Sequence, residues 1–198
     1  MLYLQILVNG LMLGGLYACI AVGFSLVWGV LNVINILHGS FVVLGSYVAF
    51  FGYAVLGIHP IVAILPAGAL MFLLGYAIQH GIINRVVGAP VLTTLVLTFG
   101  LNLLLTNAML LAFSADYRTV PLANPLGSVL VWEVILPLDR LVAMVCALAL
   151  TGMLYLILAR SRIGRAIVAV RMDAEAAALM GVQVKRIYAI TFGLGALM

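Results

Sequence analysis

Long apolar stretches separated by short polar intervals dominate this chain. Their positions predict helices at 4–30, 35–57, 60–83, 91–113, 140–159 and from 187 to the end. At about 1.5 Å of rise per residue, each of the first five is long enough to cross a bilayer core of roughly 30 Å. The sixth reaches Met198 after twelve residues. We expect it to be either half a helix packed against the others or the start of a longer one.

The composition agrees with this pattern. Hydrophobic residues make up 67% of the chain and charged residues 7%, with a mean hydropathy of +1.34, whereas soluble domains are about one quarter charged. No charged residue precedes Arg85. Every backbone polar group inside a bilayer must be satisfied within its own span, so the spans are helical. We predict an all-α polytopic transmembrane helical bundle, a single domain over 1–198, incomplete at the C-terminus because an integral protein ordinarily ends in a polar tail.

The distribution of basic residues predicts the orientation, because short cytoplasmic loops are enriched in Lys and Arg. Six of the nine cationic residues lie in the connector 160–186, and Arg85 follows the third span. Both segments are expected in the cytoplasm. The loop 114–139 carries three acidic residues and one Arg and is expected outside. With two crossings in the first 57 residues, the N-terminus also lies outside.

The outer loop contains its own structural signals. Turn residues at Pro121, Asn124-Pro125 and Gly127 are followed by a short β-branched and aromatic segment that ends at Pro137. Such a segment between helix breakers predicts a small hairpin or an interfacial cap. Tyr117 and Trp132 would then be aromatic anchors at the membrane boundary.

Polar residues interrupt the apolar pattern between the first two spans: Asn32, Asn35, His38, Gly39 and Ser40. They form either an ordinary loop at the membrane face or a helix unwound inside the bundle, where free carbonyl groups line a solute path. Flanking glycines permit close helix packing around a cavity. His38 is either a proton relay or solute contact, or a packed core histidine.

The fourth span carries a second polar row. Thr94, Thr98, Asn102 and Thr106 recur every four residues and share one helical face. The row is either a set of interhelical hydrogen bonds, worth about 1 kcal/mol or less each, or the polar wall of a substrate pathway.

The sequence lacks the motifs that are typical of several function classes. The chain has no phosphate-binding loop, no His/Cys metal spacing, no cofactor motif and no paired carboxylates inside a span. We therefore expect no enzyme activity, no bound metal or cofactor and no nucleic-acid partner. A carrier driven by protons or sodium usually needs an ionisable coupling residue in the membrane. Energy for transport is expected from a partner.

Short motifs along most of the chain resemble the permease subunits of branched-chain amino acid ABC importers. The motifs are VNGLMLGGLYA at 8–18, NILHG at 35–39, LGSY at 44–47, TFGL at 98–101, RIGRA at 162–166 and LMG at 179–181. Two features depart from the family pattern: its permeases continue past the position of Met198, and Leu37 stands where a small residue is common.

The resemblance implies a multi-pass protein of the bacterial inner membrane with several partners. These are a second permease subunit, homologous or identical, cytoplasmic ABC ATPase subunits and a periplasmic solute-binding protein, with membrane lipid around them. It also makes the unwound interpretation of 32–40 the favoured one. Its substrate-pathway residues are then Asn32, Asn35, His38, Gly39, Ser40, Thr94, Thr98 and Asn102.

Within 160–186 the resemblance implies a cytoplasmic coupling loop that docks into the ATPase. Its expected residues are Arg165, Arg171, Glu175, Ala176, Ala177 and Gly181. We expect one helix from Arg165 to Ala178 with a thin face of small residues, ended by Gly181 in a left-handed turn. The alternative is a basic amphipathic helix lying on anionic lipid.

The function expected from these features is that of a permease subunit in an ATP-driven importer for branched-chain or related amino acids. Two alternatives stay open from the sequence alone. One is a channel or facilitator for small polar solutes that works without an ATPase. The other is a truncated remnant that does not transport.

Overall fold

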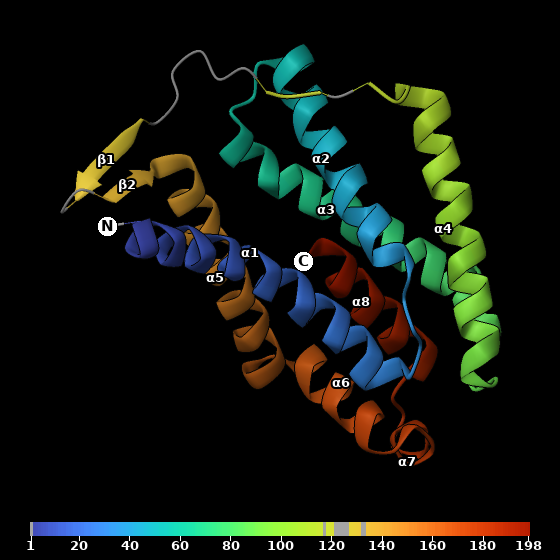
Figure 1. The fold of residues 1–198 in the computed structure, drawn as a ribbon. Helices are drawn as coiled ribbons and strands as arrows, with labels where there is room; N and C mark the ends of the chain where they lie inside the picture. Colours follow the sequence, from blue (N-terminus) through green and yellow to red (C-terminus); the bar gives the residue numbers. More distant parts are fainter. Residues whose placement is uncertain (1, 117, 121–126, 132–133) are drawn as a thin grey trace.

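The computed structural model describes residues 2–116, 118–120, 127–131 and 134–198 and is an α-helical bundle (Figure 1). Five helices are long and apolar enough to cross a membrane, and they begin and end within about two residues of the predicted spans. The all-α polytopic prediction is confirmed. The five helices are α1 (Leu2–Leu31), α2 (Leu37–Leu56), α3 (Pro60–Gly81), α4 (Val91–Phe113) and α5 (Leu138–Arg160).

Residues at the helix ends explain these boundaries. Gly57 ends α2 in the left-handed conformation, with φ of 64°, which glycine adopts without a steric penalty. His59 caps the next helix by accepting a hydrogen bond from the Ile61 amide, and Pro60 occupies the first turn, where no amide hydrogen is needed. Pro90 precedes the first residue of α4 in the same way.

The predicted outer hairpin is present. Strands β1 (Ser128–Val131) and β2 (Val134–Pro137) pair antiparallel, with Val129 opposite Leu136. The side chain of Gln5 near the start of α1 pairs with Ile135 through two hydrogen bonds of 2.8 Å, one in each direction. The N-terminus and the hairpin therefore lie on one side of the molecule, as the orientation prediction requires. Tyr117, Pro121, Asn124, Pro125 and Trp132 lie outside the described residues.

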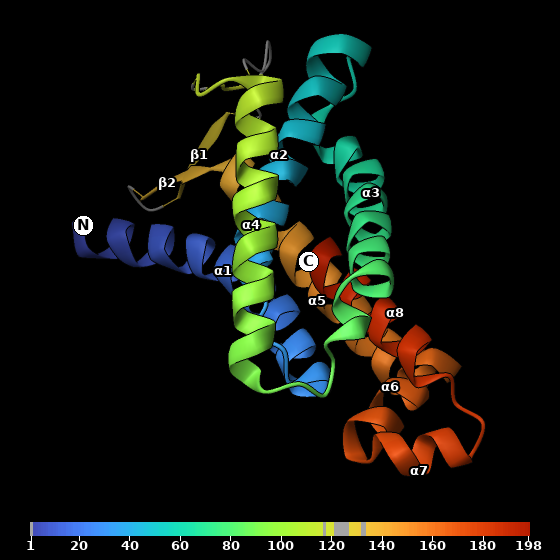
Figure 2. The same ribbon diagram turned by 90° about the vertical axis from the view of Figure 1, so that its right-hand side faces the viewer.

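The cationic connector folds into two helices, α6 (Arg162–Met172) and α7 (Ala174–Leu179), where one was expected. Asp173 interrupts the expected helix because its backbone is extended, with φ of −155°, and its carboxylate instead accepts hydrogen bonds from the first amides of α7. Figures 1 and 2 show both helices at the end of the molecule opposite the connection between α2 and α3. The short helix η1 (Ile83–Arg85) joins α3 to α4.

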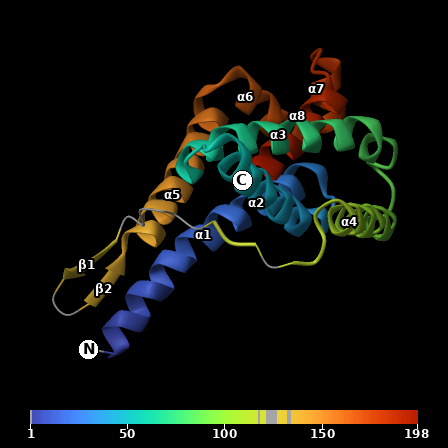
Figure 3. The same ribbon diagram turned by 90° about the horizontal axis from the view of Figure 1, so that it is seen from above.

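The last helix, α8 (Val184–Leu197), is the most deeply enclosed. At 14 residues it is about 21 Å long, and it lies between α3 and α1, with α4 standing apart on the far side of α2 (Figure 3). Glycines permit this approach: a Cβ on Gly193 would lie 2.8 Å from the Phe72 carbonyl oxygen of α3. A Cβ on Gly195 would lie 3.0 Å from the Gly23 oxygen of α1. The helix that follows α6 and α7 thus has backbone contacts on two sides.

Candidate functional site

The break between α1 and α2 is a non-helical segment of residues 32–36 that is exposed at Asn32 and buried or half-buried from Val33 onward. It begins at Asn32, which has φ of 53°, and runs from the lower end of α1 back toward the middle of the bundle, where α2 begins (Figure 1). Val33 and Asn35 are each only 1% exposed. The segment is therefore enclosed by protein, which is where unwound backbone is tolerated at membrane depth.

Side chains of α4 hold this break in place. The Thr98 hydroxyl donates a 2.8 Å hydrogen bond to the Ile34 carbonyl oxygen. One turn further along, Asn102 Oδ1 accepts a 2.6 Å hydrogen bond from Ser40, and Thr106 lies 3.3 Å from the same hydroxyl. Thr94 is turned back onto its own helix at the Val91 carbonyl. The polar row of α4 thus makes the hydrogen bonds that were one of its two interpretations, and its place in a substrate pathway stays a prediction.

Asn35 and His38 behave differently from their neighbours. Neither amide atom of Asn35 has a hydrogen-bond partner among the described residues, and the same holds for His38 Nδ1. Leaving such a buried group unpaired costs about 1–3 kcal/mol. His38 Nε2 lies 3.0 Å from the Ile20 carbonyl oxygen. Because a carbonyl only accepts, Nε2 carries the hydrogen, and in the neutral ring Nδ1 is left as an acceptor.

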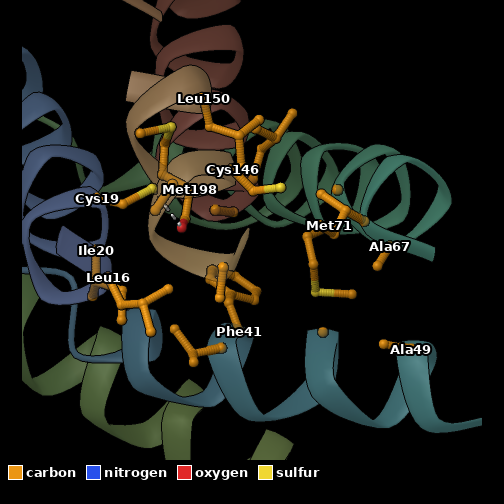
Figure 4. A pocket seen from close by; sticks show the side chains of 18 of the residues that line it. Leu16, Cys19, Ile20, Phe41, Ala49, Ala67, Met71, Cys146, Leu150 and Met198 are labelled. Carbon is orange, nitrogen blue, oxygen red and sulfur yellow. Dashed lines mark hydrogen bonds between the residues drawn. The ribbon is translucent and has the colours of Figure 1, made fainter. Parts of the chain in front are cut away.

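An apolar cavity of about 320 Å³ has His38 in its lining. Its wall is formed by α1, α2, α3, α5 and the end of α8, with Phe41, Met71 and Leu150 among the side chains that point into it (Figure 4). The described lining contains no charged side chain, and its polar groups include the His38 imidazole, the thiols of Cys19 and Cys146, and the Met198 carbonyl oxygen that accepts a hydrogen bond from Cys19. A cavity of this size and character suits a small aliphatic group.

A second hollow, the α1 recess, shares Ile20 and His38 with this cavity. It has a volume of about 470 Å³ and is lined by Tyr17, Ile20, Ala21, Phe24, Ser25, Asn35, Ile36, His38 and Gly39. Phe24 packs its ring edge-on against His38, with 6.2 Å between centroids. Of the eight pathway candidates, Asn35, His38 and Gly39 line a hollow, whereas the hydroxyl of Ser40 is bonded to α4 and Asn32 is exposed.

Helices α6 and α7 form a surface of unusual composition. Met172, Leu179 and Met180 are 84%, 89% and 85% exposed, although they lie beyond the spanning helices and among basic residues. Exposed apolar side chains gathered in one polar segment are typical of a protein or membrane contact. We call Met172, Leu179 and Met180 the apolar tip. From the sequence, Leu179 and Met180 were noted only as part of the LMG motif, and none of the three was predicted to be a contact residue.

The predicted coupling residues are distributed around the apolar tip. Arg165, Arg171, Glu175 and Ala176 are exposed, whereas Ala177 is buried at 5% and packs against the core beneath α7. Gly181 has φ of 84°, which confirms the predicted left-handed turn at the end of the segment. The Val182 amide then bonds back to the Ala177 carbonyl oxygen at 3.0 Å, so the chain passes directly into α8.

Within the part of the chain that the structure describes, no three His, Cys, Asp or Glu side chains gather closely enough to hold a metal ion. The polar side chains that line the recess are Tyr17, Ser25, Asn35 and His38.

Comparison with known proteins identifies the family. The model of the family described as "Branched-chain amino acid transport system / permease component" matches residues 6–198. The chain belongs to this family.

Individual relatives agree with the family match. The permease protein BraD of a high-affinity branched-chain amino acid transport system of Pseudomonas aeruginosa is 33% identical over 208 residues, covering 98% of this chain and 67% of that protein. The LivH permease proteins of Salmonella typhimurium and of Escherichia coli K12 are each 30% identical over 215 residues, covering 99% of this chain and 68% of theirs. No solved structure matches the chain significantly.

Family membership and fold together indicate where in the cell the permease is located. Five spanning helices and its relatives make it a multi-pass protein of a bacterial inner membrane. As the permease component of a transport system, it works with other subunits.

Proposed function

We propose that this chain is the membrane-embedded permease subunit of an ATP-driven importer for branched-chain or related amino acids. The observation that carries the proposal is the family match over 6–198, supported by relatives whose names state branched-chain amino acid transport. In this proposal cytoplasmic ABC ATPases supply the energy, a periplasmic solute-binding protein delivers the amino acid, and a second permease subunit completes the pathway.

The α6–α7 segment is the proposed ATPase contact, within a coupling loop that covers 160–186. Three features support it: the apolar tip, the exposed cations Arg165 and Arg171 around it, and the direct continuation into α8. An interface whose core is apolar and whose rim is charged is the usual anatomy of a protein contact. Glu175 and Ala176 are exposed beside the tip, whereas Ala177 supports α7 from beneath.

The polar break is the proposed solute pathway. Asn35, His38 and Gly39 face the α1 recess, and Asn32 and Ser40 flank them. Thr98 and Asn102 serve the pathway from α4 by fixing the position of the break through Ile34 and Ser40. Thr94, whose hydroxyl is bonded to Val91 of its own helix, is the third proposed pathway residue of α4. Unwound segments held at mid-membrane are recurrent solute sites in transporters.

Reconstitution tests the proposal. The permease is purified with its partner subunits, placed in proteoliposomes, and supplied with radiolabelled leucine, binding protein and ATP. Uptake should require ATP hydrolysis. Gly181→Ala, which forces a side chain onto a left-handed backbone, and Glu175→Ala should abolish leucine-stimulated ATP hydrolysis while the variants still insert into the membrane. Undiminished stimulation in both variants would contradict the coupling role.

The same vesicles distinguish the alternative function. Permease reconstituted without ATPase subunits should show no downhill leucine flux. A flux that follows the leucine gradient under these conditions would instead support a channel or facilitator.

A further inference from the structure

The floor of the α1 recess presents unpaired hydrogen-bonding atoms of a defined kind. Asn35 offers one acceptor, Oδ1, and one amide donor group, Nδ2, neither of which has a partner among the described residues. His38 offers a second acceptor at Nδ1, because its Nε2–H points to the Ile20 carbonyl oxygen. Because both residues line the recess, two acceptors and one donor group belong to its lining side chains.

The charges around this floor restrict the ligand. None of the described side chains that line the recess is charged, and neither is any that lines the apolar cavity. A ligand with a net charge would lose its hydration there without gaining an opposite charge. A zwitterion carries its own counter-charge, and its ammonium group supplies the three donors that two acceptors can share.

The two hollows match the two parts of an aliphatic amino acid, which has a polar end and an apolar side chain. The recess has amide and imidazole groups at its floor, whereas the apolar cavity is lined almost wholly by aliphatic, aromatic and sulfur-containing side chains. An amino group held at Asn35 and His38 would leave the aliphatic side chain beside that cavity.

The floor is nearly closed in this structure. Asn35 is 1% and His38 6% exposed, and Phe24 lies against the imidazole ring. A ligand reaches the floor when the rim formed by Tyr17 and Phe24 gives way. The rim itself is exposed on the outside of the bundle. An amide opened toward hydrocarbon would be unfavourable, so the second permease subunit of the proposed function would cover the recess.

We propose that Asn35 and His38 form the site that binds the α-amino end of a zwitterionic amino acid, with Asn35 Oδ1 and His38 Nδ1 as acceptors and Asn35 Nδ2 directed to the carboxylate. The proposal rests on the proposed function, because it names the solute group that the pathway recognises. It distinguishes amino acids from aliphatic acids that lack the amino group.

Two histidine variants separate the roles of the ring nitrogens. Glutamine extends its amide to about the position of Nε2, and asparagine to about the position of Nδ1. In the assembled transporter, His38→Gln should keep the bond to Ile20 and weaken equilibrium binding of radiolabelled leucine at least tenfold. His38→Asn should bind leucine within about threefold of the unaltered protein. The reverse order would overturn the proposal.

Substitution of Asn35 should also give the transporter a new ligand preference. Asn35→Leu should weaken leucine binding at least tenfold. Asn35→Asp keeps the shape but adds a negative charge, so 3-methylbutylamine, which has the ammonium group and no carboxylate, should compete with leucine at least tenfold better than before. In the unaltered transporter 4-methylpentanoate, which lacks the amino group, should compete poorly.

A matched control and two outcomes complete the design. Ser46→Ala, on the same helix but with its hydroxyl bonded to the Val43 carbonyl oxygen and outside the lining of the recess, should leave leucine binding unchanged. If Asn35→Leu and His38→Gln bind and transport leucine normally with ATP, the site is wrong and the proposed function stands. If the unaltered transporter shows no ATP-driven leucine uptake, the proposed function itself fails.

Discussion

Gly75 of α3 and Ala196 of α8 lie so close that a Cβ built on Gly75 would be 2.7 Å from the Cβ of Ala196. Both residues are buried. The same helix α8 begins directly after the proposed ATPase contact and ends beside the apolar cavity. Helix α8 is therefore a short, rigid element through which a displacement of α6 and α7 would be transmitted to the region of His38.

A reversible cross-link between these two residues should stop transport. In a background where Cys19 and Cys146 are replaced by alanine, Gly75→Cys with Ala196→Cys should form a disulfide on oxidation after α3 and α8 separate by about 1 Å, because a disulfide needs about 3.5–4.5 Å between its β-carbons. ATP-driven leucine uptake should fall at least tenfold and return on reduction. The control pair is Gly52→Cys with Ala63→Cys, whose β-carbons are 4.0 Å apart between α2 and α3. Full uptake by the oxidised Gly75–Ala196 pair would show that α8 does not move during transport.

Adding one methyl group at Gly193 should destabilise the bundle. Its Cβ would lie 2.8 Å from the Phe72 carbonyl oxygen, a backbone atom that cannot rotate away, and such overpacking costs about 1–3 kcal/mol. Gly193→Ala should lower the midpoint of thermal unfolding in detergent. Gly100→Ala, in α4 with no atom within 4 Å of its new Cβ, should leave the midpoint unchanged or raise it. Equal effects of the two variants would be inconsistent with the close packing of α8.

The hydrogen bond from Thr98 to the Ile34 carbonyl should be measurable. Thr98→Val keeps the shape and removes the hydroxyl, so it should cost about 1 kcal/mol or more, because the buried carbonyl is left without this donor. Thr98→Ser keeps the hydroxyl and should retain most of the stability. Hydrogen exchange at the amides of 33–37 should be faster in the valine variant alone. Exchange that is equal in the two variants would mean that α4 does not hold the break.

Polar replacement of the apolar tip should uncouple the permease from its ATPase. Leu179→Ser with Met180→Ser removes two apolar side chains that are 89% and 85% exposed, so the variant should fold and insert normally. Co-purification of the ATPase and leucine uptake should each fall at least tenfold. Val129→Ser, at an exposed apolar position on the outer hairpin, is the control and should have no effect. An unaffected tip variant would favour a lipid contact for α6 and α7.

Chemical labelling should find the two ends of the bundle on opposite sides of the membrane. A membrane-impermeant maleimide should modify Tyr3→Cys in intact cells, because the start of α1 lies with the outer hairpin. It should modify Arg171→Cys only after permeabilisation. Both side chains are exposed, so a difference in their labelling reports the side of the membrane and not the exposure of the side chain. Labelling of Arg171→Cys in intact cells would overturn the orientation.

Local sequence signals predicted the helices well, because a span is a long one-dimensional feature. The fourth span coincides with α4 at both ends, and Gly181 has the left-handed turn expected of it. The split at Asp173 was also readable: an Asp followed by small helix formers is a helix cap, but the alanine-rich run around it suggested continuity.

The candidate site was harder to predict from the sequence than the helices were. That Asn35 and His38 are unpaired, whereas Ser40 is not, depends on residues of α4 more than 60 positions away. The burial of α8 likewise depends on glycines of α1 and α3 that meet only in the folded chain. Spacing identified the polar positions, and three-dimensional packing decided which of them are left to bind a ligand.

The pairing of Gln5 with Ile135 also has a consequence for biosynthesis. The two residues are 130 positions apart in the chain, and at about 5–20 residues per second a ribosome needs roughly 10 s to make that length. The first helix enters the lipid long before its hairpin and α5 exist. It therefore remains in the membrane without its packing partner α5, so that Gly15, which lies against Met144 in the folded chain, faces the insertion machinery or neighbouring lipid until the fifth helix is made.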